Sequence, residues 1–221
     1  MADKILTAHQ HEFLEFVKKQ PTLIEQFYFT GGTCLSEYYL HHRFSEDLDF
    51  FSENEIDPQA ITILLHTNKS ILGYKKMDFQ QSFNRNLFFL IFSKKQQLKI
   101  EFTYFPFERI DSSKSKNGLS IDSMQDIAVN KLFTIYQKPR GRDFYDLFAM
   151  YRKTPWNLRT LMKLARIKFD TNIDPLQLGR NLIQVEELKD DPLVINQKYQ
   201  YKEVATFFNK ISRSLKSEVI G

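Results

Sequence analysis

The feature that most constrains the fold is a pair of glycines that follows a short aromatic run. Residues 27–30 read Phe-Tyr-Phe-Thr, which is typical of a buried strand, and they lead directly into Gly31 and Gly32. The next ten residues, 33–42, have the composition of a helix that begins at the glycines. Glycines at a helix N-terminus let backbone N–H groups approach an anion, which the helix dipole also favours. The sequence therefore predicts a phosphate-binding turn, to which Thr33 would add a hydroxyl contact.

The segment after this helix predicts a strand with two carboxylates on one face. Residues 43–46 form a short loop, and residues 47–51 then read Asp-Leu-Asp-Phe-Phe. The period of two places Asp47 and Asp49 on the same face. Two carboxylates in this arrangement converge on a hard cation that also binds nucleotide phosphates, and magnesium is the natural choice. Ser45, just before the strand, would add a second hydroxyl contact.

A third carboxylate lies on a predicted hairpin formed by residues 87–92 and 98–104. In its second arm Glu101 alternates with apolar residues, so it lies on the polar face of a sheet. Glu101 would complete a two-metal site, in which one ion activates the attacking hydroxyl and the other stabilises the leaving pyrophosphate. Each feature also has a simpler interpretation, because a Gly-Gly pair is often only a turn and an Asp-x-Asp strand can be a solvated edge.

The rest of the chain is predicted to be mainly helical, with a boundary near residue 150. We expect residues 1–150 to form one domain and residues 151–221 a helical C-terminal region. In the first domain, the amphipathic segment around residues 13–19 should end before Pro21, and residues 111–120 should form a loop. The other helices are expected at residues 58–68, 124–137 with Asp122 or Ser123 as the cap, 142–151, 157–169, 175–189 and 201–217.

Composition excludes several classes of protein. Hydrophobic residues make up 42% of the 221 residues and charged residues 26%, which is typical of a folded globular chain. The longest apolar runs are far shorter than the roughly 20 residues of a membrane-spanning helix, and the polar N-terminus is unlike a signal peptide. The single cysteine, Cys34, cannot form an internal disulfide and excludes a cysteine zinc cage. These features predict a cytoplasmic protein without a membrane partner.

The charge is uneven along the chain. Residues 151–221 carry 13 basic and 8 acidic residues, whereas residues 1–150 carry 18 and 19. In the helix at 157–169, Arg159, Lys163 and Arg166 form a basic stripe. The stripe is either a contact for RNA or only a solvated face. Three aromatic residues in this region could stack on bases or belong to the core: Trp156, Tyr199 and Tyr201.

Two blocks of sequence resemble one family of enzymes. The first block is residues 29–35, Phe-Thr-Gly-Gly-Thr-Cys-Leu, with residues 42–51, His-Arg-Phe-Ser-Glu-Asp-Leu-Asp-Phe-Phe. The second is Asp-Ile-Ala-Val-Asn-Lys at 126–131 with Arg-Asp-Phe-Tyr-Asp-Leu at 142–147. Together they resemble the AbiEii/AbiGii group of toxins in the nucleotidyltransferase superfamily. The resemblance covers residues 25–150 and implies an α+β fold, an α/β/α sandwich whose mixed sheet is flanked by helices.

The resemblance also implies roles for the matching residues. Lys131 would be a point-charge ligand for the nucleotide phosphates, and Asp143 the catalytic or orienting carboxylate, with Asp146 as the alternative that instead makes a structural bond. Either Glu101 or Asp143 would take the proton of the attacking hydroxyl. Glu101 stands where an Asp is common in the family, so the number of bound metal ions, one or two, stays open. The residues expected to bind the triphosphate are Gly31, Gly32, Thr33, Arg43, Ser45, Lys131 and Arg142, and those expected to bind metal are Asp47, Asp49 and Glu101.

The function that follows is a magnesium-dependent transfer of a nucleoside monophosphate from an NTP to an acceptor hydroxyl, with release of pyrophosphate. The resemblance implies a toxin of a toxin–antitoxin or phage-defence system, neutralised by a cognate antitoxin, with transfer RNA as a plausible acceptor. Two alternatives stay open: transfer to a protein or small molecule, and a catalytically silent module that binds NTP or protein. The adjacent His41 and His42 are interpreted as a cap at a helix end rather than as a metal ligand or general base.

Overall fold

The computed structural model describes residues 5–111, 114–187 and 199–219. The chain divides into two compact units. Unit 1 comprises residues 1–37, 45–108 and 112–122, and unit 2 comprises residues 38–44, 109–111 and 123–221. The division differs from the expected boundary at residue 150, because residues 123–150 belong with the C-terminal helices. Phe133, for example, stacks on Phe169 with ring centroids 3.9 Å apart.

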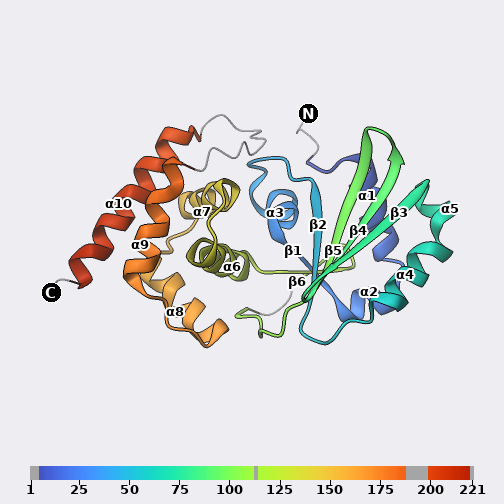
Figure 1. Ribbon diagram of the computed structural model, residues 1–221, viewed down its shortest axis with the longest axis horizontal. Helices are drawn as coiled ribbons and strands as arrows, with labels where there is room; N and C mark the ends of the chain where they lie inside the picture. The colour runs from blue at the N-terminus through green and yellow to red at the C-terminus, as the bar shows by residue number, and fades with distance from the viewer. Residues whose placement is uncertain (1–4, 112–113, 188–198, 220–221) are drawn as a thin grey trace. The chain divides into compact units, whose positions relative to one another are not determined.

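Unit 1 is built on a seven-stranded mixed sheet (Figure 1). In spatial order the strands are β3 (Lys76–Ser82), β4 (Arg85–Ser93), β5 (Gln96–Tyr104), β2 (Asp47–Ser52), β1 (Tyr28–Thr30), β7 (Leu119–Ile121) and β6 (Lys114–Lys116). The expected strand at 47–51 and the expected hairpin of β4 and β5 are confirmed. Strand β2 runs parallel to β5 and antiparallel to β1. Most of the expected loop at 111–120 is instead the hairpin of β6 and β7.

The local signal for this second hairpin lies in its turn and not in its strands. Asn117 and Gly118 both have positive φ angles, 51° and 81°. Asn-Gly at the two central positions is the strongest short signal for a two-residue hairpin. The strands on either side are only three residues long, and one of them contains no apolar residue, so the local pattern lacks the alternation that marks a strand.

The helices of unit 1 lie on both sides of the sheet (Figure 1). They are α1 (Ala8–Val17), α2 (Pro21–Gln26), α3 (Gly31–Leu35), α4 (Pro58–Thr67) and α5 (Lys69–Leu72). In Figure 1, α3 lies on the opposite side of the sheet from α1, α2, α4 and α5. As expected, the first helix, α1, ends before Pro21, which itself opens α2 because proline fits the first turn of a helix. The expected helix at 33–42 is the α3 turn followed by a π-helical turn, η1 (Ser36–Leu40).

The core of unit 1 is aromatic. Phe29, Phe50, Phe88 and Phe102 are at most 1% exposed. Phe50 lies 5.3 Å from both Phe29 and Phe102, measured between ring centroids, and 6.2 Å from Phe13 on α1. Leu48 and Phe50 therefore point from β2 into the core. The alternation of the strand leaves Asp47 and Asp49 on the opposite face, next to α3.

Unit 2 is helical. Its elements are α6 (Met124–Gln137), α7 (Gly141–Lys153), α8 (Leu158–Phe169), α9 (Pro175–Ile183), the short helix η2 (Gln184–Glu186) and α10 (Tyr201–Val219). Ser123 caps α6 as expected, since its side chain accepts a hydrogen bond from the Asp126 N–H. Tyr199 packs on Phe148 with ring centroids 5.3 Å apart, and Phe144 packs on Phe208 at 5.0 Å. No helix in the described ranges is long and apolar enough to span a membrane.

Candidate functional site

The glycine turn of unit 1 is built around the side chain of Asp49. Gly31 has a φ of +75°, a conformation that residues with a Cβ rarely adopt. A Cβ at this position would lie 2.1 Å from Oδ2 of Asp49. Only glycine fits here, for two independent reasons. The predicted turn and the predicted carboxylate therefore lie together, with the carboxylate over the start of α3.

The two hydroxyl groups expected to contact phosphate differ in their environments. Thr33 is fully buried, and its hydroxyl donates a hydrogen bond to the backbone oxygen of Asp47. The Thr33 hydroxyl therefore joins α3 to β2, and its contact with phosphate stays a prediction. Ser45 is half-buried, and its hydroxyl makes no hydrogen bond within the described ranges. Ser45 is therefore the hydroxyl that remains available to a ligand.

The pairing of β2 with β5 arranges the charged groups of unit 1. The register places Asp47 beside Lys99 and Asp49 beside Glu101. Lys99 Nζ lies 2.6 Å from Oδ2 of Asp47, and both side chains are 25% exposed. The pair is open to water, so it can exchange partners with a bound ligand at little cost in free energy.

Glu101 is held much more firmly. Arg85 donates two hydrogen bonds of 2.6 Å to its two carboxylate oxygens, and the Thr103 hydroxyl donates a third of 2.7 Å. Glu101 is only 5% exposed. Burial works to raise the pKa of Glu101, but the hydrogen bonds from Arg85 and Thr103 outweigh it and keep the pKa below its usual value. Glu101 is thus an ionised carboxylate with one of about four lone-pair sites left open.

These contacts bear on the number of metal ions. Within residues 5–111, 114–187 and 199–219, no three His, Cys, Asp or Glu side chains converge as a metal cage would require. Glu101 is paired with Arg85, so its role as a third metal ligand beside Asp47 and Asp49 stays a prediction. Asp47 and Asp49 still fit magnesium, which commonly binds to one or two carboxylates and completes its shell with water and substrate phosphates.

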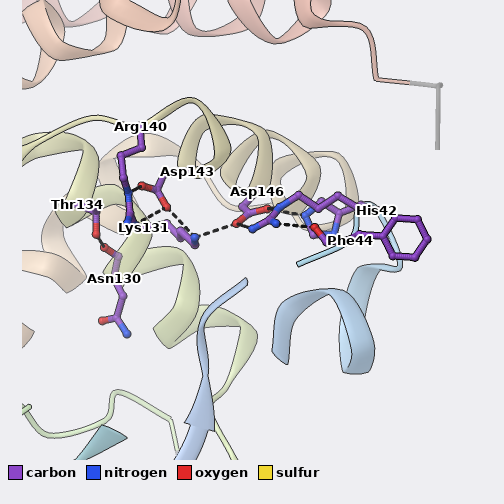
Figure 2. Close-up of polar contacts among 9 residues, drawn as sticks. His42, Phe44, Asn130, Lys131, Thr134, Arg140, Asp143 and Asp146 are labelled. Atoms are coloured by element: carbon purple, nitrogen blue, oxygen red, sulfur yellow. Dashed lines mark hydrogen bonds and ion pairs between the residues drawn. The ribbon is translucent and has the colours of Figure 1, made fainter. Parts of the chain in front are cut away.

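Unit 2 contains a separate cluster of buried charges (Figure 2). Lys131 on α6 lies between two carboxylates of α7, with Nζ 2.7 Å from Asp143 and 2.8 Å from Asp146. Arg140 also pairs with Asp143, at 2.6 Å. Arg43 pairs with both oxygens of Asp146. Asp143 and Asp146 are fully buried, and together they face three permanent cations.

The cations keep both carboxylates of this cluster ionised. Burial works to raise the pKa of Asp146, but Arg43 and Lys131 outweigh it and hold the pKa well below its usual range. The pKa of Asp143 is lowered in the same way by Lys131 and Arg140. His42 Nε2 lies 2.7 Å from Asp146 Oδ1 and donates to it, since an ionised carboxylate only accepts. Burial lowers the pKa of His42 despite this hydrogen bond.

The residues of unit 2 expected to bind nucleotide have unequal environments. Arg43 is 4% exposed and its guanidinium is used by Asp146 and by the backbone oxygen of Phe44. In this arrangement Arg43 supports the cluster, and its contact with the triphosphate stays a prediction. Lys131 is 8% exposed and bridges two carboxylates. Arg142 is exposed, and its side chain makes no hydrogen bond or ion pair in the described part of the chain.

The two histidines and Asp126 also have structural roles. His41 is exposed with a φ of +50°, whereas His42 is the buried partner of Asp146 and not a surface cap. Asp126, from the second family block, forms a fully buried ion pair of 2.6 Å with Lys168. Asp126 also accepts hydrogen bonds from the N–H groups of Ile110 and Asp111. It therefore fixes the start of α6 to α8 and to the segment 109–111.

Sequence reasoning missed the basic partners of these carboxylates, namely Arg85, Lys99, Arg140 and Lys168. Lys99 carried a local signal, because it shares the polar face of its strand with Glu101. Arg140 carried another, since it lies three residues before Asp143 and next to a helix start. Arg85 and Lys168 had no local signal, because strand register and helix packing bring them to Glu101 and Asp126.

The glycine turn, the Asp-x-Asp strand and the mixed sheet define a nucleotidyltransferase. The chain belongs to the family described as nucleotidyl transferase AbiEii toxin, type IV toxin–antitoxin system, whose model matches residues 15–216. The family match confirms the resemblance inferred from the two sequence blocks, and it extends through the C-terminal helices that those blocks did not cover.

Known proteins resemble the chain over nearly all of its length. An uncharacterized protein of Aquifex aeolicus strain VF5 is 30% identical over 207 residues, which are 93% of this chain and 95% of that protein. Two solved structures from Helicobacter pylori share the fold at 20% identity. One is described as a candidate nucleotidyltransferase, with a TM-score of 0.60 over 96% of this chain and 97% of that chain. The other is JHP933, with a TM-score of 0.57 over 95% and 91%. The expected α+β fold is confirmed.

Proposed function

We propose that the protein is a magnesium-dependent toxin that transfers a nucleoside monophosphate from an NTP to a hydroxyl of RNA. Membership of the AbiEii family supports the transfer and the toxin role. The observation that carries the proposal is the position of Asp49 over Gly31, with Asp47 on the same face of β2. An anion-binding turn beside two carboxylates suits a nucleotide triphosphate and its magnesium ion.

The residues of unit 1 have distinct roles in this proposal. The backbone N–H groups at Gly31 and Gly32 and the free hydroxyl of Ser45 would bind the triphosphate. Asp47 and Asp49 would hold magnesium, with Lys99 released from Asp47 to a phosphate oxygen. Magnesium, when bound, supplies positive charge that stabilises the departing pyrophosphate.

The chemical step needs little covalent participation from the protein. The acceptor oxygen forms a bond to the α-phosphorus while the bond from that phosphorus to the bridging oxygen breaks, and pyrophosphate leaves with the electron pair. We assign the acceptor's proton to Glu101, because Glu101 lies beside Asp49 in the sheet and keeps one lone-pair site open. Asp143 is buried and forms ion pairs with Lys131 and Arg140, so we assign it the role of positioning Lys131.

The role of Lys131 and Arg142 as phosphate ligands stays a prediction from the family motif. Arg142 is exposed and has no hydrogen bond or ion pair with any residue that the structure describes, which favours it. Lys131 would have to give up one of its two carboxylates, and the carboxylate left without it would still be held by Arg140 or Arg43. An antitoxin encoded with the protein would be its natural partner, and transfer RNA is one acceptor of the proposed class.

The direct test is a transfer assay. Purified protein is incubated with magnesium, total RNA and each NTP labelled on the α-phosphate, and the label is followed into RNA, into protein or into neither. We expect label in RNA with one NTP, and none with Asp49→Asn or without magnesium. An α-label distinguishes nucleotidyl transfer from phosphorylation, which would carry only a γ-label. Label on protein would show that the acceptor is a protein and not RNA. If a folded protein gave no label with any NTP, a catalytically silent binding module would be favoured.

A further inference from the structure

Unit 2 contains a cavity that the proposed chemistry does not use. It has a volume of about 370 Å³ and lies between the end of α7, the start of α8 and α10. Its walls include Tyr151, Trp156 and Phe207, with Arg159 at the edge formed by α8. This volume is at the lower end of the range for small-molecule sites, about 300 to 1,000 Å³. Three aromatic side chains around one space favour a flat, aromatic ligand.

Tyr151 brings one polar group to this largely apolar wall. The Tyr151 hydroxyl is buried and has no hydrogen-bond partner among the residues described. Burial raises the pKa of Tyr151, which keeps the hydroxyl protonated and able to donate.

The surface next to the cavity is basic. Helix α8 contains no acidic residue, and Arg159, Lys163 and Arg166 are all exposed. Their spacing of four and three residues places them on one face of the helix, starting at the residue that lines the cavity. The fourth basic residue, Lys168, is buried against Asp126 and is not part of this face. A ligand that places its aromatic part in the cavity would therefore extend its anionic part along α8.

We propose that this cavity and the basic face of α8 bind single-stranded RNA, with one unpaired base in the cavity and the phosphates on Arg159, Lys163 and Arg166. A base provides the flat ring, and the RNA backbone provides the negative charges at intervals. The proposal rests on the proposed function only for the idea that the bound RNA is the acceptor. Binding itself requires neither NTP nor magnesium.

The chain offers an internal probe for the test, because Trp156 is its only tryptophan. A fluorescein-labelled single-stranded RNA of roughly 12 nucleotides, within the usual site sizes, is titrated with full-length protein. Anisotropy reports binding, and quenching of Trp156 in a parallel titration with unlabelled RNA reports whether a base stacks in the cavity. We expect both signals to change together, and we expect weaker binding to duplex RNA of the same length.

Variants separate the two parts of the site. Trp156→Ala should weaken binding about tenfold or more, while Trp156→Phe keeps most of the affinity. Replacing Arg159, Lys163 and Arg166 by alanine should reduce the slope of log affinity against log salt by about 2. Lys95→Ala, an exposed lysine of unit 1, is the control and should leave the slope nearly unchanged.

Several outcomes would overturn the proposal. These are RNA that binds without quenching Trp156, equal affinity for single-stranded and duplex RNA, and wild-type affinity in a correctly folded Trp156→Ala protein. Binding of polyglutamate as tight as RNA would instead identify a general anion surface that fits an acidic protein. Asp49→Asn should bind RNA like the wild type. An inactive protein that still binds RNA would therefore count against the proposed transfer and not against this site.

Discussion

The carboxylates of unit 1 and those of unit 2 come from the two sequence blocks of one family, yet they differ in how firmly the fold holds them. Asp47 on β2 is 25% exposed and has one lysine partner, which is equally exposed. Asp146 on α7 is fully buried and contacts three basic side chains, His42, Arg43 and Lys131. The first arrangement can exchange partners with a ligand, whereas the second is already complete. A match to a motif therefore does not distinguish chemistry from support; exposure and partners do.

The largest effect should come from breaking the buried cluster. Asp146→Asn removes the charge that balances Arg43 and Lys131, so we expect a loss of about 3 to 5 kcal/mol in the free energy of unfolding. Asp47→Asn, which breaks only the partly exposed pair with Lys99, should cost about 0 to 1 kcal/mol. Urea unfolding of both variants measures the difference. Equal losses in the two variants would show that the cluster is not the more important one for stability.

For the transfer rate we expect the opposite order, with the carboxylates of unit 1 more important than those of unit 2. Asp49→Asn keeps the shape of the side chain but removes a charge next to the glycine turn, so the transfer rate should fall about 100-fold or more. Its unfolding free energy should change by less than about 1 kcal/mol. A labelled-NTP assay and a urea titration on the same preparation test both parts. A variant that is active, or one that is inactive because it is unfolded, would contradict the assignment of Asp49.

The parts of the site that sequence could predict are those set by local chemistry. Alternation along β2 placed Asp47 and Asp49 on one face, and the glycines marked the start of α3; both follow from a few adjacent residues. The partners of the carboxylates depend on register instead. Arg85 lies 16 residues from Glu101 in the sequence and is brought to it by β4 pairing with β5.

Two other differences have similar physical origins. The unit boundary was expected at residue 150. Instead, α6 and α7 pack their apolar surfaces against the other helices of unit 2. Composition does not show which apolar surfaces pack together. His42 looked like a cap at a helix end. In the structure the chain turns at His41, with φ +50°, and His42 is buried against Asp146, 104 residues away in the sequence.

A smaller effect concerns the turn at Gly31, where the chain offers a matched control. Gly31→Ala meets both a positive φ and a clash with Asp49, so we expect a loss of about 2 to 4 kcal/mol in the free energy of unfolding. Gly73 also has a positive φ, 72°, but a Cβ there would meet nothing within 4 Å. Gly73→Ala should therefore cost only about 1 to 2 kcal/mol. Thermal unfolding of both variants isolates the contribution of the contact with Asp49, and equal losses would show that this contact has no energetic weight.

The smallest effect is a pH dependence that only the buried cluster should produce. The pKa of His42 is lowered in the folded protein, because it is buried and lies near Arg43 and Lys131. The unfolded chain therefore takes up this proton first. The contribution to stability is complete above the ordinary histidine pKa of about 6.5, and it is lost as the pH falls through the lowered value.

Asp143 and Asp146 do not interfere in this range, because their lowered pKa values make their contributions fall only at more acidic pH. Urea unfolding at about pH 7 and about pH 5 measures the slope. His42→Gln should make stability less dependent on pH over this range, while His66→Gln, at an exposed position on α4, should leave the dependence as in the wild type. If both variants kept the wild-type slope, a group other than His42 would cause the pH dependence of stability. The pH dependence would then no longer distinguish the buried cluster from the open site of unit 1.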